Sequence, residues 1–292
     1  MSGPIWRTSR FAIDLARPRV MGIVNVTPDS FSEGGAALST AAQAIARCEQ
    51  MLVEGADILD IGGESSRPGA LPVSAEEELA RVRPVLTAAV SHGVPVSIDT
   101  TKVEVMRVAL DLGVDIVNDI AALRTRGALD LVAGHPRCGV CLMHMRGMPR
   151  TMQVDPHYDD VVGEVAAFLG ERIAAATAAG IGSDRIVVDG GVGFGKNDRH
   201  NFALLGRQDA LLALGVPLLA GWSRKSTLAR LAGVAATPPA ERSPAQRATL
   251  DAASVAASLL AVQRGARIVR VHQVAAMVAA LAVWKAAPEP RG

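Results

Sequence analysis

Short apolar segments alternate with longer amphipathic segments from one end of the chain to the other. The short segments are almost continuously apolar, which is typical of parallel strands buried on both faces. A turn residue or a helix-ending glycine precedes most of them. The predicted strands are Val20–Val24, Asp57–Ile61, Pro95–Ile98, Asp115–Val117, Gly139–Met143, Arg185–Val188, Pro217–Ala220 and Arg267–Val271.

The segments between these strands repeat apolar residues at helical spacing. Ser74 followed by Glu77 predicts a capping box, and Ser39 or Thr40 predicts the start of an Ala-rich helix. Glycines that end helices and lead into the next strand are Gly55, Gly113, Gly180 and Gly265. The predicted helices are Thr40–Val53, Ser74–Val90, Val103–Leu112, Tyr158–Ala179, Asn201–Leu214, Thr249–Arg264 and Gln273–Trp284.

Eight strand–helix units with no break in composition predict an α/β chain that folds as one (β/α)₈ TIM barrel over residues 1–292. A doubly wound sheet is the alternative, although it rarely reaches eight regular units without an inserted domain. Residues 1–19 form an N-terminal extension and 286–292 a flexible tail. The segment Gly233–Arg247, rich in Ala, Pro and Ser, is expected to be an exposed elaboration of the seventh unit.

Composition and charge exclude several classes of protein. Of the 292 residues, 49 % are hydrophobic and 3 % aromatic, which favours helices on short aliphatic strands over a β-sandwich. The formal net charge of +1 lacks the basic excess of a nucleic-acid-binding protein. The chain has no apolar stretch long enough for a signal peptide or a membrane span. We therefore expect a cytoplasmic protein with no nucleic-acid or membrane partner.

The three cysteines are Cys48, Cys138 and Cys141. An odd number in a chain without an export signal fits a reducing compartment. The Cys138-x-x-Cys141 spacing also occurs in redox and zinc sites, but here it lies in an apolar strand-like run without a second ligand pair. Buried inert thiols are the expected state.

Polar residues gather directly after the predicted strands, where the chemistry of such barrels is found. Taken singly, Asp99 and Asn118 could cap the following helices, Asp119 is expected to be structural, and His144 a satisfied histidine. The remaining histidines, His92, His135, His157 and His200, receive no role. The polar residues after the strands are Asn25, the run Gly62–Gly69, Asp99, Thr100, Asn118, Asp119, His144, Asp189, Ser223, Arg224, Lys225, Arg270 and His272.

The last of these polar residues along the chain suggest a bound anion. Asp189 enters a glycine-rich run that would let a ligand approach closely. Arg270 and His272 alternate on one strand and can both point into the mouth. Since no carboxylate is evident beside Arg270 in the sequence, we expect a bound anion to compensate it. No cluster of metal ligands and no Ser-His-Asp order is present in the sequence.

Eight motifs together resemble the dihydropteroate synthase family, over a match from about Val20 to the last helix. The combination is highly specific. The resemblance implies a homodimeric (β/α)₈ barrel that transfers the pterin-methyl group of 6-hydroxymethyl-7,8-dihydropterin pyrophosphate to p-aminobenzoate in folate biosynthesis, with Mg²⁺ as cofactor. The motifs are Asn25–Gly35, Gly62–Ala70, Ser97–Thr100, Asn118–Ile120, Leu142–Met145, Phe194–Lys196, Ser223–Ser226 and Arg270–His272.

Residue by residue, the resemblance implies three groups of substrate-binding residues. It places Asp99, Asp189 and Lys225 at the reacting centre. Pterin would be held by Asp99, Asn118, Met143, Asp189 and Lys225. Pyrophosphate would be held by Asn25, Ser66, Arg67, Arg270 and His272. Asn25 would also contact Mg²⁺. The p-aminobenzoate pocket would comprise Phe31, Ser66, Pro68, Phe194, Ser223, Arg224 and Lys225, closed over by the Asn25–Gly35 and Gly63–Gly69 loops. The implied mechanism is dissociative, and sulfonamides are implied competitors of p-aminobenzoate.

Four positions depart from the family pattern. Ser66 replaces a usual Thr, Gly190 and Val192 stand where Pro and Phe are common, and Gln273 replaces a frequent Asp. None of these changes removes a proposed catalytic group. Two alternatives share a pterin site, namely a methyltransferase using methyltetrahydrofolate and a catalytically silent paralogue. The methyltransferase would not need the pyrophosphate-side residues. In a silent paralogue the motif residues of the two loops should be lost, whereas both loop motifs are intact here.

Overall fold

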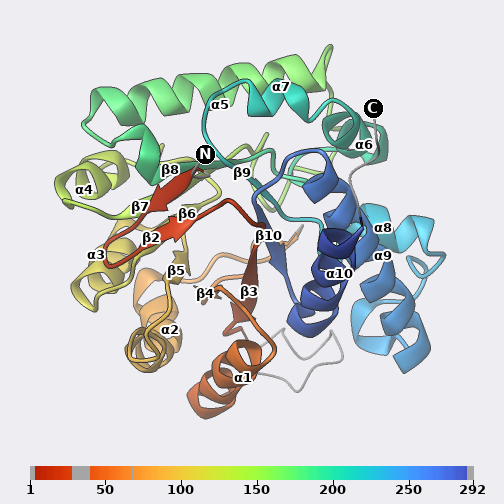
Figure 1. Cartoon of the computed structure of the whole chain (residues 1–292), viewed down its shortest axis with the longest axis horizontal. Helices are drawn as coiled ribbons and strands as arrows, with labels where there is room; N and C mark the ends of the chain where they lie inside the picture. Colours follow the sequence, from red (N-terminus) through yellow and green to blue (C-terminus); the bar gives the residue numbers. More distant parts are fainter. Residues whose placement is uncertain (1–3, 28–39, 68, 288–292) are drawn as a thin grey trace.

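Eight parallel strands close into a barrel in the computed structural model, which describes residues 4–27, 40–67 and 69–287 (Figure 1). Neighbouring strands pair in chain order, and the last pairs with the first, so no edge is left open. The (β/α)₈ prediction is confirmed, and a doubly wound sheet is excluded. The barrel strands are β3 (Arg19–Asn25), β4 (Ile58–Gly62), β5 (Val96–Asp99), β6 (Ile116–Asp119), β7 (Gly139–Met143), β8 (Ile186–Asp189), β9 (Leu218–Ala220) and β10 (Ile268–Val271).

Helices surround this barrel, as Figure 1 shows. Sequence reasoning missed α4 and α8, which are too short to display a clear helical period. The single helix predicted over Asn201–Leu214 is two helices, and α9 begins at Pro244 instead of Thr249. The helices are α1 (Ala41–Val53), α2 (Ala75–Val90), α3 (Val103–Asp111), α4 (Ala128–Gly134), α5 (Val161–Ala178), α6 (Asp198–Gly206), α7 (Asp209–Leu212), α8 (Ser226–Leu231), α9 (Pro244–Gln263) and α10 (Val274–Ala286).

The predicted helix ends are largely confirmed. Thr40 caps α1 in a full capping box with Gln43. Ser74 accepts the Glu77 N–H at 3.1 Å, but the Glu77 carboxylate binds Arg81, so only half of that predicted box is formed. The glycines that follow α1, α3, α5 and α9 have φ between 92° and 102°, a conformation that glycine adopts without strain.

The N-terminal residues form a hairpin that the sequence did not reveal. Strands β1 (Ile5–Arg7) and β2 (Ala12–Asp14) pair antiparallel. The Trp6 side chain is fully buried, and its indole N–H donates to the Arg185 carbonyl at 2.9 Å. In Figure 1 the hairpin (red) lies on the near side of the molecule. The hairpin packs against the inward side chains at the amino ends of the strands, which are Met21, Ile58, Ile116, Cys141, Val187, Leu219 and Ile268.

The larger core lies between the barrel and its helices. Outward strand residues such as Val24, Ile61 and Val140 pack there against helix residues such as Leu86 and Val165. This layer leaves the carboxyl ends of the strands free for polar groups. The predicted elaboration contains the turn η3 (Pro239–Glu241) and then the start of α9. In the described residues, no helix combines the length and apolar character needed to cross a membrane.

Candidate active site at the carboxyl end of the barrel

A cavity of about 310 Å³ opens at the carboxyl ends of the barrel strands. The predicted site residues come from distant parts of the sequence and meet here. Phe31 and Pro68, predicted for the second-substrate pocket, lie outside the described residues. The lining includes the predicted residues Asn25, Ser66, Arg67, Asp99, Asn118, Met143, Asp189, Phe194, Ser223, Arg224, Lys225, Arg270 and His272.

Strand ends explain this convergence. Asn25, Asp99, Met143 and Asp189 are each the last residue of their strand. Because the strands are parallel and closed into a barrel, their final residues all reach one rim. Asn118 is next to last in β6 and lies on the same rim. Helix α3 begins after Lys102 and α4 after Gly127, so neither Asp99 nor Asn118 caps a helix.

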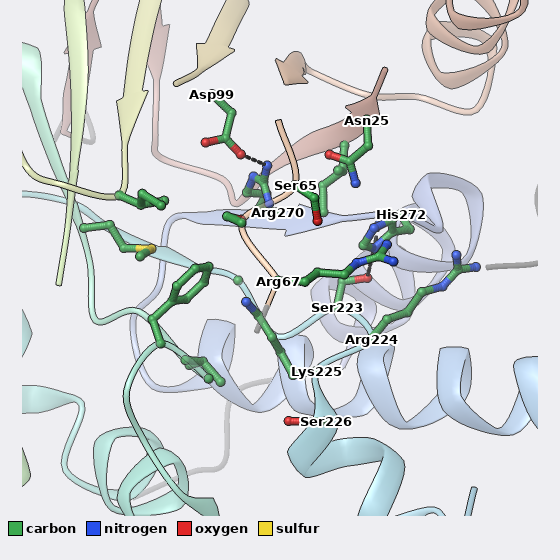
Figure 2. Close-up of a pocket in the computed structure, with 18 of the residues that line it drawn as sticks. Asn25, Ser65, Arg67, Asp99, Ser223, Arg224, Lys225, Ser226, Arg270 and His272 are labelled. Carbon is green, nitrogen blue, oxygen red and sulfur yellow. Dashed lines mark hydrogen bonds and ion pairs between the residues drawn. The ribbon is translucent and has the colours of Figure 1, made fainter. Parts of the chain in front are cut away.

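Arg270 is held by two carboxylates inside this rim, and Figure 2 shows its pair with Asp99. Its Nε donates to Asp60 Oδ2 at 2.6 Å, and a terminal nitrogen donates to Asp99 Oδ2 at 2.6 Å. Burial opposes the charge of Arg270, but the two carboxylates raise its pKa. Burial raises the pKa of Asp99 to about 7 against the attraction of Arg270. The expectation that Arg270 lacks a carboxylate is therefore wrong, and its charge requires no bound anion.

Asp60 supports two residues of the site and was missed by sequence reasoning, although it does not line the cavity itself. Its side chain is fully buried, and besides Arg270 it accepts from Asn118 Nδ2 at 3.3 Å. The signal was present, because Asp60 is a charged residue in the interior of a strand expected to be buried on both faces. Asp60 thus links Arg270 and Asn118, two of the residues predicted to bind the substrates.

Asp189 and Lys225 form the next part of the rim. Asp189 Oδ1 accepts the Gly191 N–H at 2.7 Å, and burial raises the pKa of this carboxyl. Burial lowers the pKa of Lys225 to about 8, although the Asp189 carboxylate favours the charged form. The Lys225 ammonium lies 4.2 Å from the centre of the Phe194 ring. Acceptor, donor and aromatic face therefore border the same space.

The residue directly after the last strand, His272, adds a polar group to the same cavity. The His272 N–H donates to Ser223 Oγ at 3.1 Å, and the imidazole Nδ1 lies 2.9 Å from that hydroxyl. Burial, and then the surrounding cations Arg224 and Arg270, lower the pKa of His272 well below its usual value. Figure 2 shows Arg67 directed toward His272, whose pKa it also lowers. His272 is thus a neutral imidazole within a group of cations.

Arg224 also lies at the rim but has a carboxylate partner outside the cavity lining. Its guanidinium donates to both carboxylate oxygens of Asp251 on α9, at 2.7 and 3.0 Å. Gln273, one of the departures from the family pattern, donates to the same Asp251 at 2.8 Å. An Asp at position 273 would instead place a second carboxylate beside Asp251.

An apolar wall completes one side of the cavity. Met143 and Phe194 pack with Ile120, Met145 and Met152 in a small buried cluster. Such a wall suits the face of a flat ring, while the polar groups of the rim suit its edge. The cavity can therefore hold a heterocycle with hydrogen-bonding edges beside an anionic group.

Several other predictions can be judged from the same residues. Asp119 accepts the N–H groups of Ala121 and Leu123, both at 2.7 Å, which confirms its structural role. Among the residues described, no group of three His, Cys, Asp or Glu side chains could hold a metal ion. The cysteine prediction is confirmed, because Cys48, Cys138 and Cys141 are buried free thiols whose pKa burial raises.

Comparison with known proteins gives a consistent result. The family described as pterin binding enzyme matches residues 21–272. The chain is 52 % identical over 290 residues to a dihydropteroate synthase of Neisseria meningitidis serogroup B, with 98 % of each chain covered. A Xanthomonas albilineans dihydropteroate synthase in complex with 7,8-dihydropteroate is 47 % identical, with a TM-score of 0.82 over 97 % of this chain and 98 % of that one. A Yersinia pestis dihydropteroate synthase with a sulfonamide drug is 41 % identical, with a TM-score of 0.88 and the same coverage.

Proposed function

The chain belongs to the dihydropteroate synthase family of pterin-binding enzymes, and from this premise we infer the reaction that its cavity carries out. It condenses 6-hydroxymethyl-7,8-dihydropterin pyrophosphate with p-aminobenzoate to give 7,8-dihydropteroate and pyrophosphate. The observation that carries this function is the single cavity lined by Asp99, Asn118, Asp189, Lys225 and Arg270. A methyltransferase of related fold would not need the cationic side of this cavity.

Asp189, Asn118 and Lys225 hold the pterin in our proposal. A carboxylate accepts two parallel N–H bonds, so Asp189 fits an amino group and an adjacent ring N–H. Lys225, whose charge the Asp189 carboxylate favours, donates to the ring carbonyl. Met143 and the rest of the apolar wall pack on the ring face. Asp99 completes the polar edge while paired with Arg270.

The pyrophosphate lies on the side where β10 meets β3, near Asn25, Arg270 and His272. These two strands are neighbours, which brings residues from the two ends of the sequence together. Arg67 and Ser66 enter the same cavity from the loop after β4. Cations there favour an anionic leaving group more as its charge develops, which lowers the barrier to its departure.

Asn25 is the residue that would hold Mg²⁺. Mg²⁺ prefers oxygen ligands and is usually bound by one or two side chains together with substrate phosphates and water. The carboxamide oxygen of Asn25 at the cavity fits that mode, whereas the described residues offer no all-protein carboxylate cage. When bound, the ion would neutralise charge on the pyrophosphate.

We take the order of bond changes from the dissociative mechanism that the family resemblance implies, and the groups present are compatible with it. The bond between the pterin methylene carbon and the pyrophosphate oxygen breaks first, and the electron pair leaves with pyrophosphate. The aniline nitrogen of p-aminobenzoate then bonds to this carbon and releases a proton. The cavity supplies cations for the leaving group and acceptors for the electron-poor pterin, so catalysis rests on positioning and charge stabilisation.

The second substrate lies beside Phe194 and Lys225, near Ser66, Ser223 and Arg224. The cation–ring contact keeps the Lys225 ammonium close to where the two substrates meet. Sulfonamides that mimic p-aminobenzoate compete at this position. Phe31 and Pro68 remain part of the proposal from sequence alone.

We further propose that the enzyme is a cytoplasmic homodimer. The buried free thiols support a reducing compartment. The dimer rests on the family resemblance, and sedimentation velocity on the full chain tests it.

The decisive experiment measures pyrophosphate release with each substrate alone and with both. Release that requires both substrates supports the synthase, and a chain that binds pterin pyrophosphate without turnover is a silent paralogue. Isothermal titration of pterin pyrophosphate, with and without Mg²⁺, gives the contribution of the ion. Asp189→Asn should weaken pterin binding by roughly ten- to a hundred-fold, because a charge-assisted acceptor is lost.

A matched control separates binding from folding. Asp115 is a fully buried carboxylate paired with Arg10 at the opposite end of β6. Asp115→Asn removes a comparable buried charge far from the cavity, so it should lower stability without changing pterin affinity. Equal loss of affinity in both variants would contradict the role assigned to Asp189.

A further inference from the structure

Lys196 is a fully buried lysine that the proposed reaction does not use. It lies on the loop that joins β8 to α6, and only 1 % of its surface is exposed. A buried ammonium is costly unless hydrogen bonds replace its water. The Lys196 ammonium lies 2.8 Å from His144 Nδ1 and donates to the carbonyls of Gly191 and Phe194 at 3.0 and 3.1 Å. All three of its donors therefore have acceptors.

His144 can accept because its imidazole is neutral. Burial, and then the neighbouring Lys196, lower the pKa of His144 to about 3. Burial also lowers the pKa of Lys196 to about 7, while the Asp189 carboxylate favours the charged form. The prediction that His144 is a satisfied histidine is confirmed, and its partner is this lysine.

The acceptors come from two neighbouring segments. Gly191 and Phe194 belong to the loop after β8, and His144 directly follows β7. The two segments touch closely, since a Cβ built on Gly191 would lie 1.9 Å from the His144 carbonyl oxygen. Lys196 thus closes the β8 loop on itself and ties it to the end of β7.

This arrangement acts on the cavity through the two peptide groups that flank the Gly191 Cα. The Gly191 carbonyl accepts from Lys196, and the Gly191 N–H donates to Asp189 Oδ1 at 2.7 Å. The same loop carries Phe194, which faces Lys225. Lys196 itself is absent from the cavity lining. It acts on Asp189 through the backbone it holds and through its positive charge, which lowers the pKa of that carboxyl against the effect of burial.

We propose that Lys196 is a positioning residue that fixes the backbone on both sides of Gly191 and thereby aims the Asp189 carboxylate at the pterin. The proposal rests on the function inferred above. Without the ammonium, the Gly191 and Phe194 carbonyls lose their common donor and the loop loses its bond to His144. Asp189 would then keep its place at the end of β8, but the Gly191 N–H that orients its carboxylate would no longer be held in position.

Arg185 provides a control of the same kind at the other end of the barrel. It belongs to the turn η2 (Ser183–Arg185) and is buried. Its guanidinium donates to the carbonyls of Cys138, Val132 and His135 at 2.8, 3.2 and 3.0 Å. Arg185 therefore also links the β7 and β8 regions through backbone acceptors, but far from the cavity.

The test compares Lys196→Met with Arg185→Met by titrating pterin pyrophosphate into the full-length protein and by thermal melting. Both variants should melt at lower temperature than the parent. Only Lys196→Met should weaken pterin pyrophosphate binding, by roughly ten- to a hundred-fold. Unchanged affinity in Lys196→Met, or an equal loss in Arg185→Met, overturns the proposal.

A second pair of variants keeps the test open if Lys196→Met does not fold. Asn at position 144 can place an acceptor near the site of the imidazole Nδ1, whereas Leu cannot. His144→Asn should retain most of the pterin affinity that His144→Leu loses, and equal affinities would refute the proposal. A parent protein that fails to bind pterin pyrophosphate would instead refute the proposed function.

Discussion

Arg270 and Asp60 form an ion pair inside the barrel, with 2.6 Å between Nε and Oδ2. The Asp60 side chain is fully buried, and the Arg270 side chain is 19 % exposed. The pair joins β10 to β4 across the intervening strand β3. Because Asp99 binds the other side of the guanidinium, Arg270 is fixed before any ligand arrives. Its direction in the cavity is therefore a property of the fold.

We expect Asp60→Asn to be strongly destabilising. The substitution leaves an acceptor for Arg270 but removes a buried charge, and losing one partner of a buried pair costs roughly 3 kcal/mol of unfolding free energy. Urea denaturation measures this cost. Asp184→Asn breaks an Arg7 pair whose side chains are at least half exposed, and it should cost less than about 1 kcal/mol. Similar costs for the two variants would show that Asp60 is not a buried ionic partner.

The pH dependence of activity should report the protonation of Lys225. Burial lowers its pKa to about 8, so the donating ammonium is present below that pH and is lost as pH rises through it. Loss of the Lys225 ammonium should therefore lower the kcat/KM for pterin pyrophosphate above about pH 8, in addition to the fall that loss of the Lys196 ammonium causes above about pH 7. Lys225→Arg keeps a donor that stays protonated in this range, so the part of the fall above about pH 8 should move to higher pH.

Lys102→Arg is the control for this pH profile. Lys102 pairs with Glu64 and Glu78 and is not part of the cavity lining. The variant keeps the positive charge at that position, so its alkaline limb should coincide with that of the parent. If Lys225→Arg also retained the parental limb, another group would control activity at high pH.

The sequence was sufficient to predict the barrel because the pattern repeats. All eight strands were located within about two residues of their observed ends, since each is a short apolar run bounded by clear turn signals. The position of the site residues at one rim was predictable from the same regularity, because the last residues of parallel strands lie at the same end of the barrel. Elements too short to repeat the pattern were not predicted, such as the seven-residue α4 and the six-residue α8.

Pairings inside the site could not be predicted in the same way. Arg270 is 210 positions from Asp60 in the sequence, and Lys196 is 52 positions from His144. No local pattern relates such residues, and their contact depends on barrel closure and loop geometry. A buried charge in an apolar segment was the one available signal, and it marks Asp60 but not its partner.

The N-terminal hairpin should contribute stability and no chemistry. Trp6 is fully buried at the amino end of the barrel, so Trp6→Ala should cost roughly 3–5 kcal/mol through the cavity it leaves. Trp6→Phe retains much of the packing but loses the bond to the Arg185 carbonyl, and should cost less. Denaturation measures both effects. KM values of the folded variants should equal those of the parent, and a changed KM would show that the hairpin communicates with the cavity.

Gly191 is the position where a single methyl group should be most damaging to pterin binding. Its φ is +67°, and an added Cβ would lie 1.9 Å from the His144 carbonyl oxygen, so the backbone itself must move. Gly191→Ala should therefore displace the N–H that holds Asp189 and reduce pterin affinity at least about ten-fold, as titration would show.

Gly93 has a similar φ of +71°, but a Cβ added there would meet no atom within 4 Å. Gly93→Ala should cost about 1 kcal/mol of stability from backbone strain alone, with unchanged affinity. If both variants bound pterin as the parent does, close approach of the β7 and β8 loops would be irrelevant to the ligand.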